Sequence, residues 1–289
     1  MPFTTIQESG TKVIGSTTLV FPQTLHPKVA AFINLQSANS VSLTNTQVNA
    51  LNNLYIGLVA NGLDTKMNAL YPFIGGSATA HKFNLMDARD ADAAFRLNFV
   101  GGWTHDSNGS TPNGTTGYAN TFLTPSISLS VSSGHFSFYS RVQALLATNV
   151  DMGASSTAVA ADIVSLVIGR NTNSSSCAWG TQAVNTIATL SSSSSQGFFV
   201  GNQNGATAAA RSVFRNGIAS ATATVYGSPA MSSTSTITIG ALNTGTGGIN
   251  FFSSRQCSLA SIGSGLSNTE VNIFSVLVQA YETALGRNV

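Results

Sequence analysis

Charged residues are scarce in this 289-residue sequence. Asp, Glu, Lys and Arg make up 8% of the chain, about a third of their usual share in soluble proteins. The polar surface must therefore consist mainly of Ser, Thr, Asn, Gln and Gly. A weakly charged surface opposes association little and favours packing into an assembly. The net charge is +2 and the Lys and Arg residues form no stripe, so we expect no nucleic-acid interface.

Long hydrophobic stretches and targeting signals are also missing. The longest apolar runs, VAAFI and IVSLVI, are far shorter than the roughly 20 residues that a membrane-spanning helix needs. The opening residues, MPFTTIQESG, have neither the basic start nor the apolar centre of a signal peptide. We therefore expect no membrane insertion.

Cysteine is nearly absent as well. Cys177 and Cys257 are too few for a disulfide framework and lack the spacing of a metal site. We expect two buried, reduced thiols, because free cysteine behaves as a small apolar residue. A bridge between neighbouring strands is the alternative.

Short β-strands dominate what is present. Residues 211–226 read as a hairpin whose tip, Asn216-Gly217, favours a type I′ turn. Alternating apolar residues continue through 235–243, with Ile237 and Ile239, and through 258–262. Further strands are expected over residues 95–99, 127–131 and 135–139, and over 163–170, which reads as buried on both faces. Frequent turns and few helices predict an antiparallel β-sandwich.

Two helices are marked by capping boxes. Ser267 and Glu270 begin a helix that ends near Gly286, and Thr44 and Gln47 begin one that ends at Gly62. We expect a second short helix over 64–71, which Pro72 would end. Upstream, two apolar patches at 11–20 and 26–35 could be strands without a local partner. They would form either an arm that attaches to a neighbouring subunit or edge strands of the main domain.

The order of these motifs resembles a known family. The hairpin with its NG tip, the ITIG strand, and the segment from LSNTE to ALGR are similar to the end of a concanavalin A-like (laminin G-like) jelly-roll domain. More narrowly, the chain resembles such domains in virion structural proteins of tailed bacteriophages. The resemblance continues upstream through LYPFIGGSATAHKFNLMDARDADAAFRLNFVGGWTH, PNGTTGYANTFLTPS and HFSFYSR. It covers residues 43–289.

This resemblance implies an organisation, a function and a location. The chain would comprise an N-terminal arm (1–42), a helical connector (43–74) and a jelly-roll domain (75–289). It would be a structural protein exposed on the virion as a head or tail fibre, spike or decoration subunit, assembled in the bacterial host cytoplasm. Its partners would be other virion proteins and further copies of itself, with a trimer favoured. The alternative is a receptor-binding, lectin-like module that recognises host surface polysaccharide.

Some members of the wider family hydrolyse glycosides, which requires a pair of carboxylates flanking the bond. The resemblance implies that such an enzyme would carry both carboxylates on one strand, in the pattern E-x-D-x-x-E. No predicted strand of this chain has two acidic residues at alternate positions. The chain has three glutamates: Glu8 in the arm, Glu270 in a helix cap and Glu282 in the last helix. The four histidines are far apart in the sequence. We therefore expect no catalytic residues and no cofactor.

One loop is a candidate glycan site. Residues 101–118 offer Trp103 and Tyr118 as flat faces for a sugar ring, with polar groups around them from His105, Asp106, Asn108 and Asn113. Alternatively, Trp103 is a core or interface anchor and the rest is a solvated turn.

A weaker candidate is a Ca²⁺ site at Asp87, Asp90 and Asp92, because three carboxylates lie close together in the sequence. The alternative is that Arg89 and Arg96 neutralise these carboxylates.

Overall fold

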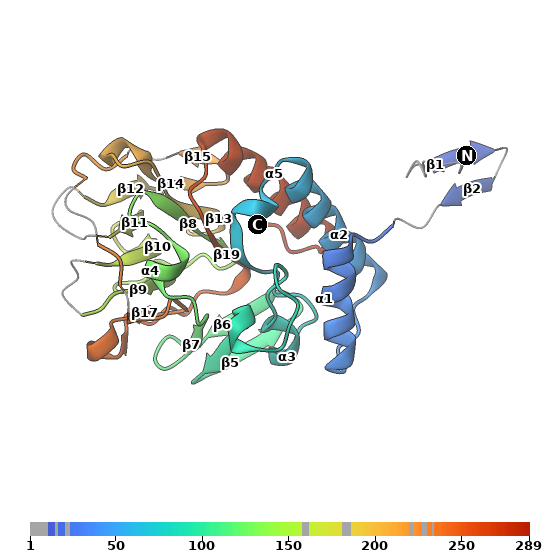
Figure 1. The fold of residues 1–289 in the computed structure, drawn as a ribbon, viewed down its shortest axis with the longest axis horizontal. Helices are drawn as coiled ribbons and strands as arrows, with labels where there is room; N and C mark the ends of the chain where they lie inside the picture. Colours follow the sequence, from blue (N-terminus) through green and yellow to red (C-terminus); the bar gives the residue numbers. More distant parts are fainter. Residues whose placement is uncertain are drawn as a thin grey trace.

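The computed structural model describes residues 11–14, 17–20, 24–157, 162–180, 186–219, 222–226, 230–232 and 234–289, the first two ranges by their backbone. Two β-sheets lie face to face, and helices cover the outer face of one of them (Figure 1). Among the described strands the pairings are antiparallel except that between β17 and β9, and Leu146 forms an isolated parallel bridge with Arg170. The predicted antiparallel β-sandwich with a C-terminal helix is confirmed.

The helix-covered sheet has eight strands in the order β15-β14-β13-β8-β19-β6-β5, with β3 also paired to β19. Its strands are β3 (Met67–Tyr71), β5 (Trp103–Asp106), β6 (Gly109–Pro112), β8 (Ser133–Ser140), β13 (Gly197–Asn204), β14 (Arg211–Arg215), β15 (Ile218–Ala219) and β19 (Cys257–Gly263). β19 is central, between β8 on one side and β3 and β6 on the other.

The second sheet has nine strands in the order β12-β11-β10-β9-β16-β7-β4, with β17 and β18 beside β9. Its strands are β4 (Asn98–Val100), β7 (Tyr118–Asn120), β9 (Met152–Ala154), β10 (Val164–Arg170), β11 (Ser174–Trp179), β12 (Ala188–Ser191), β16 (Thr238–Ile239), β17 (Leu242–Asn243) and β18 (Ile249–Asn250).

Alternation along β8 builds two separate cores. Phe136 and Phe138 point into the core between the two sheets, where they join Leu166 and Trp179 of the second sheet. Tyr139 points the other way, into the core between the eight-stranded sheet and the helices. The molecule therefore has three layers: helices, eight-stranded sheet and nine-stranded sheet. The outer face of the nine-stranded sheet carries only a small third cluster.

The helical layer consists of α1 (Pro27–Ala38), α2 (Asn45–Ala60) and α5 (Asn268–Ala284). Both predicted capping boxes are present, at Thr44 and at Ser267. Helices α2 and α5 approach closely at Gly57, where an added Cβ would lie 2.4 Å from Leu277 Cδ2. Short helical turns are α3 (Ala78–His81), α4 (Pro125–Ser128), η1 (Asp64–Lys66), η2 (Asp92–Ala94), η3 (Ala208–Ala210) and η4 (Gly245–Gly247). Among the described helices, none has the length and apolar character needed to cross a bilayer.

Several predicted elements hold, three are wrong, and the strand predicted over 95–99 is only partly present, because Phe95 ends η2 with φ 58° and β4 begins at Asn98. The type I′ hairpin is confirmed, since Asn216 and Gly217 have φ of 50° and 81°. Residues 26–35 form most of α1 rather than a strand, because His26 caps the helix with its side chain and Pro27 begins it. Residues 67–71 form β3 rather than a helix, because they complete the ladder of β19.

The third wrong prediction is a strand over 127–131. Pro125 begins the helical turn α4, and Ile127 is 83% exposed, so the apolar alternation there marks no buried face. The patch at 11–20 also differs from the expectation, because β1 (Thr11–Ile14) and β2 (Thr17–Val20) pair with each other. Figure 1 shows this hairpin apart from the three layers. The division into arm, connector and jelly-roll domain stays a prediction.

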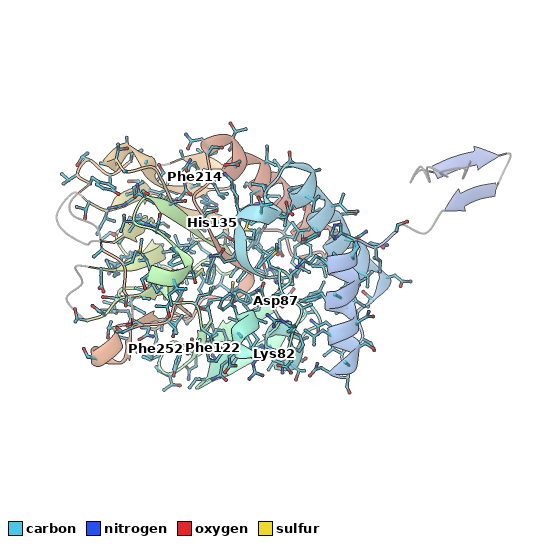
Figure 2. All side chains as sticks on the ribbon, in the orientation of Figure 1. Lys82, Asp87, Phe122, His135, Phe214 and Phe252 are labelled. Atoms are coloured by element: carbon cyan, nitrogen blue, oxygen red, sulfur yellow. The ribbon has the colours of Figure 1, made fainter. Side chains whose placement is uncertain are left out.

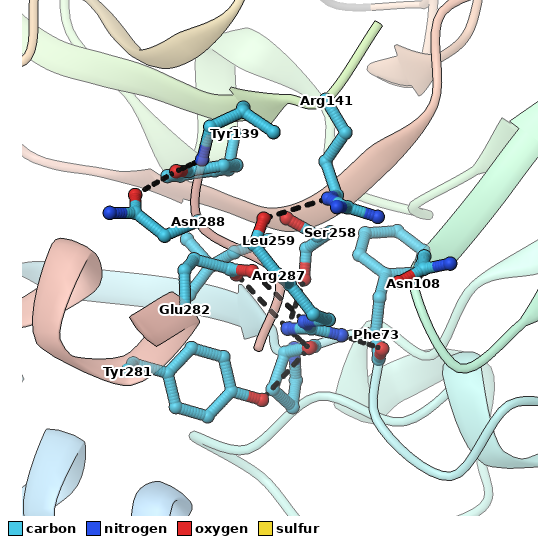
Figure 3. Close-up of polar contacts among 12 residues, drawn as sticks. Phe73, Asn108, Tyr139, Arg141, Ser258, Leu259, Tyr281, Glu282, Arg287 and Asn288 are labelled. Carbon is cyan, nitrogen blue, oxygen red and sulfur yellow. Dashed lines mark hydrogen bonds and ion pairs between the residues drawn. The ribbon is translucent and has the colours of Figure 1, made fainter. Parts of the chain in front are cut away.

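Polar contacts join the end of α5 to β8, to β19 and to the segment that follows β3 (Figure 3). The Arg287 guanidinium donates to the carbonyls of Phe73 (2.8 Å) and Ser258 (3.2 Å). The Tyr281 hydroxyl donates to the Pro72 carbonyl at 3.0 Å, and the Tyr139 hydroxyl lies 2.6 Å from Asn288 Oδ1. These hydrogen bonds fix the position of α5 on the eight-stranded sheet.

Both cysteines are buried and free. Cys177 lies on β11 and Cys257 on β19, in different sheets. Burial raises the pKa of the Cys177 thiol to about 12, so this thiol is uncharged near neutral pH. The expectation of two reduced, buried thiols is confirmed.

Candidate functional site

The loop predicted to bind glycan forms the hairpin β5–β6. Trp103 lies half-buried with its ring edge-on to Phe99, at a centroid distance of 5.0 Å. Its indole Nε1–H donates to the carbonyls of Val100 (3.1 Å) and Tyr118 (3.2 Å). The ring packs against the core between the sheets. The indole N–H is therefore already committed to the main chain, as the core-anchor alternative requires.

His105 takes part in a hydrogen-bonded chain that the sequence did not reveal. His81 Nε2 accepts from the Gly76 amide at 3.2 Å, which leaves the proton on Nδ1. That Nδ1 lies 2.8 Å from Ser110 Oγ, and Ser110 Oγ lies 2.9 Å from His105 Nδ1. Ser110 therefore accepts from His81 and donates to His105.

Burial keeps this pair of histidines neutral. Loss of solvent lowers the pKa of His81 to about 3, and burial also lowers the pKa of His105. Ser110 is fully buried, so it is closed to an external substrate. This contact could not be predicted from the sequence, because the two histidines come from different elements, α3 and β5.

The remaining polar groups of the loop mainly stabilise its own turns. Asp106 Oδ1 accepts from the Asn108 amide at 2.7 Å. Asn113 Oδ1 accepts from the amides of Thr116 and Gly117, each at 2.9 Å. The structure brings Trp103, His105 and the Tyr118 main chain together and leaves Asp106 and Asn108 at the hairpin tip. A glycan platform at this hairpin stays a prediction.

The aspartates considered for Ca²⁺ are paired with cations. Asp87 bonds Arg89, Asp90 bonds both Lys82 and Arg96, and Asp92 bonds Arg96. Figure 2 shows Asp87 and Lys82 in the part of the chain beside α1. Within the described ranges, no group of three or more His, Cys, Asp or Glu side chains could hold a metal ion. The alternative, neutralisation by arginine, is what the geometry favours.

A pocket of about 270 Å³ opens on the outer face of the nine-stranded sheet. Strand alternation creates it: Val164 and Leu166 point into the core, so Ser165 and Val167 point outward. Its apolar floor is the third cluster, formed by Val150, Ile163, Val167, Ala178 and Leu242. Thr148, Ser165 and Ser176 add hydroxyl groups, and Ile187, Phe251 and Arg170 complete the lining.

Phe251 supplies an exposed aromatic ring to this pocket. It follows the β17–β18 hairpin and is 44% exposed. Its backbone φ is 55°, an unfavourable value for a bulky residue. The Val150 amide donates to the Phe251 carbonyl at 2.8 Å and so fixes this conformation. Strain held in this way at a pocket rim is typical of a functional position.

Arg170 ends β10 and is the one charged residue among the described residues that line the pocket. It follows a β-bulge at which Gly169 adopts φ 55° and donates to Ser175 Oγ at 3.0 Å. Its Nε is shielded from solvent and has no hydrogen-bond partner. The sequence shows the strand but not this pocket, because Phe251 comes from a segment some eighty residues downstream of Arg170 that reads as a turn.

No family model matches this chain, and no curated protein matches its sequence. Among solved structures, the binding domain of botulinum neurotoxin serotype D is similar, at 13% identity and a TM-score of 0.45, over 74% of this chain and 52% of that one. Trypanosoma rangeli sialidase in complex with sialic acid is similar at 12% identity and a TM-score of 0.45, over 73% of this chain and 33% of that one.

A third similar structure is the K499G mutant of the NanB sialidase from Streptococcus pneumoniae, at 15% identity and a TM-score of 0.41. It is matched over 60% of this chain and 27% of that one. The chain thus spans about half or less of the length of these proteins. Similarity at this level does not indicate what the chain binds.

Proposed function

We propose that this protein is a carbohydrate-binding module whose site is the pocket on the outer face of the nine-stranded sheet. The observation that carries the proposal is the lining: an exposed aromatic ring at Phe251, three hydroxyl groups and one guanidinium above an apolar floor. Sugars present apolar C–H faces and a rim of hydroxyls, so they need an aromatic surface with convergent polar groups. The volume of about 270 Å³ suits one or two rings of a longer chain.

Binding without catalysis is the activity that this lining supports. Of the lining residues that the structure describes, none is Asp, Glu, His or Cys, the usual sources of general acids, bases and nucleophiles. A glycosidase would need a pair of carboxylates at the bound sugar. Serine and threonine in the pocket have no base among the lining residues to activate them.

The test is a glycan array followed by calorimetric titration of the best ligand. Phe251→Ala should weaken binding by on the order of tenfold, the lower end of what removing an aromatic stacking partner costs a nucleic-acid base, about 1–3 kcal/mol. Ile218→Ala is the matched control, since Ile218 is 74% exposed on β15 of the other sheet. If Phe251→Ala binds the glycan as tightly as wild type, this pocket is not the binding site. The hairpin that carries Trp103 would then be the next candidate.

A second candidate function is that of a virion structural protein, with this module on the particle surface. The family resemblance and the scarcity of charge support it, together with α2, which has no charged residue along its 16 positions. In this role the chain would be located in the virion and would contact other virion proteins. Antibody labelling of intact particles and constant stoichiometry on copurification would test it. Free protein that blocks infection would indicate that both functions belong to one molecule.

A further inference from the structure

Arg170 differs from the other cationic residues of this chain. Every other Lys or Arg whose side chain the structure describes makes a hydrogen bond or an ion pair. Arg255, for example, bonds Asp151 and three main-chain carbonyls. Arg170 has no such partner, and its Nε is closed off from solvent. A shielded donor left unpaired costs free energy, which a bound acceptor would recover.

Nearby carboxylates are already engaged elsewhere. Asp151 follows the lining residue Val150, and it accepts from Arg255, Ser253 and the Ile168 amide. Asp162 precedes the lining residue Ile163, and it accepts from Ser155 Oγ and the Ser156 amide. The sequence of the undescribed segments 158–161 and 181–185, AVAA and TQAVN, contains no acidic residue. Among the residues that the structure describes, the positive charge of Arg170 therefore has no carboxylate partner.

We propose that the pocket selects saccharides that carry a carboxylate, with Arg170 as the residue that recognises it. This inference rests on the proposed carbohydrate-binding function. A guanidinium presents paired N–H donors that match the two oxygens of a carboxylate, and hydrogen bonds between charged partners are about twice as strong as neutral ones. Ser165 and Ser176 would bond ring hydroxyls, while Phe251 would cover the apolar face of the ring.

The apolar part of the lining favours a carboxylate carried on a sugar ring over a free inorganic anion. Arg170 lies in the same lining as the apolar side chains of Val167 and Leu242. A free inorganic anion would satisfy the guanidinium but would leave this apolar surface and the Phe251 ring uncovered. A sugar acid satisfies both at once.

The experiment is calorimetric titration of the full chain with trimers of galacturonate, glucuronate and mannuronate. Each trimer is paired with its neutral counterpart and with its methyl ester. We expect at least one acidic trimer to bind ten- to a hundredfold more tightly than its neutral and esterified forms. Arg170→Gln should abolish that difference and leave the neutral trimer within about twofold, while Arg170→Lys keeps part of it. Arg89→Gln, which removes an exposed cation, is the matched control and should change nothing.

Each outcome decides between the two proposals. Equal affinity for acidic and neutral trimers overturns the carboxylate inference and leaves carbohydrate binding in place. A preference that survives in Arg170→Gln overturns the role of Arg170. Sodium acetate that binds as tightly as the acidic trimer would make this an anion site and overturn the saccharide part. Failure of every trimer to bind, with no ligand on the glycan array, overturns the proposed function itself. Because the methyl esters are compared with the acidic trimers on the wild-type chain, they test the carboxylate preference even if the Arg170 variants fold poorly.

Discussion

Arg287 Nε lies 2.9 Å from Glu282 Oε2 in an ion pair that is shielded from solvent on both sides. Breaking such a pair is costly because it leaves one buried charge without its partner. We expect Arg287→Met to lower the free energy of unfolding by about 3–5 kcal/mol. Urea denaturation followed by circular dichroism measures this loss.

The double variant Glu282→Leu, Arg287→Met is the control for the same pair. With both charges removed, the apolar replacements should restore part of the stability lost in the single variant. If the loss of the double variant relative to wild type equals the sum of the losses of Glu282→Leu and Arg287→Met measured singly, the idea that the charges compensate each other is contradicted.

His135 predicts a dependence of stability on pH. Burial lowers its pKa from 6.5 to about 4, against a smaller opposing effect of the hydrogen bond to Ser264. Below pH 6.5 the unfolded chain binds a proton that the folded chain resists. The stability that neutral His135 contributes is therefore fully present above pH 6.5. As the pH falls toward 4, the free energy of unfolding decreases by about 3 kcal/mol at most. His81, with a lowered pKa of about 3, acts in the same direction.

Denaturant titrations of wild type and His135→Gln between pH 7 and pH 4 check this prediction. The variant should be less stable at pH 7 but should lose less on acidification. Gln47→Ala is the comparison, because it removes a helix cap without a titrating group and should shift stability by a similar amount at every pH. Identical pH slopes for wild type and His135→Gln would refute it.

Trp103 distinguishes a core anchor from a sugar platform. Because its ring packs on the core and its N–H bonds two carbonyls, Trp103→Ala should lower stability by about 3 kcal/mol. Tyr118→Ala should lower it by about 1 kcal/mol, since the side chain is only half-buried. Thermal unfolding measures both. Weakened glycan binding by Trp103→Ala with an unchanged melting temperature would support the platform instead.

Association is the fourth prediction. We expect the full chain to form a homo-oligomer, most favourably a trimer, because little charge opposes contact between copies and the β1–β2 hairpin offers unpaired strand edges. Light scattering coupled to size exclusion measures the mass of the full chain and of a version lacking residues 1–23, which keeps α1 intact. A full-length monomer at micromolar concentration refutes association. Unchanged mass after truncation refutes the hairpin as its cause.

Local signals in the sequence predicted the parts of the fold that depend on neighbouring residues. The caps at Thr44 and Ser267 and the turn at Asn216 depend on hydrogen bonds and backbone angles within a few positions, so the sequence specifies them directly. The alternation of apolar residues along β8 predicted a strand for the same reason. Strand β3 could not be predicted, because its conformation is imposed by β19, nearly two hundred residues downstream.

In the candidate sites, too, features set by neighbouring residues could be predicted from the sequence and features set by distant residues could not. The aromatic loop at 101–118 was visible because its residues are adjacent, but the commitments of its side chains to Val100, Ser110 and His81 depend on folding. The pocket on the outer sheet face was not visible, because Arg170 and Phe251 come from separate segments. Within the described part of the chain Arg170 has no hydrogen-bond partner, which depends on where the carboxylates lie after folding and so could not be predicted from the sequence.

The central position of β19 has a consequence for how the molecule reaches its fold. Until Cys257–Gly263 is in place, β8 and β3 each have an open edge, because β19 pairs with both. Contacts this distant in sequence form slowly, on the millisecond-to-second scale typical of β-rich domains. During that interval another copy could donate its own β19 to the gap. Dilution during refolding should therefore decide whether chains emerge individually or with exchanged strands.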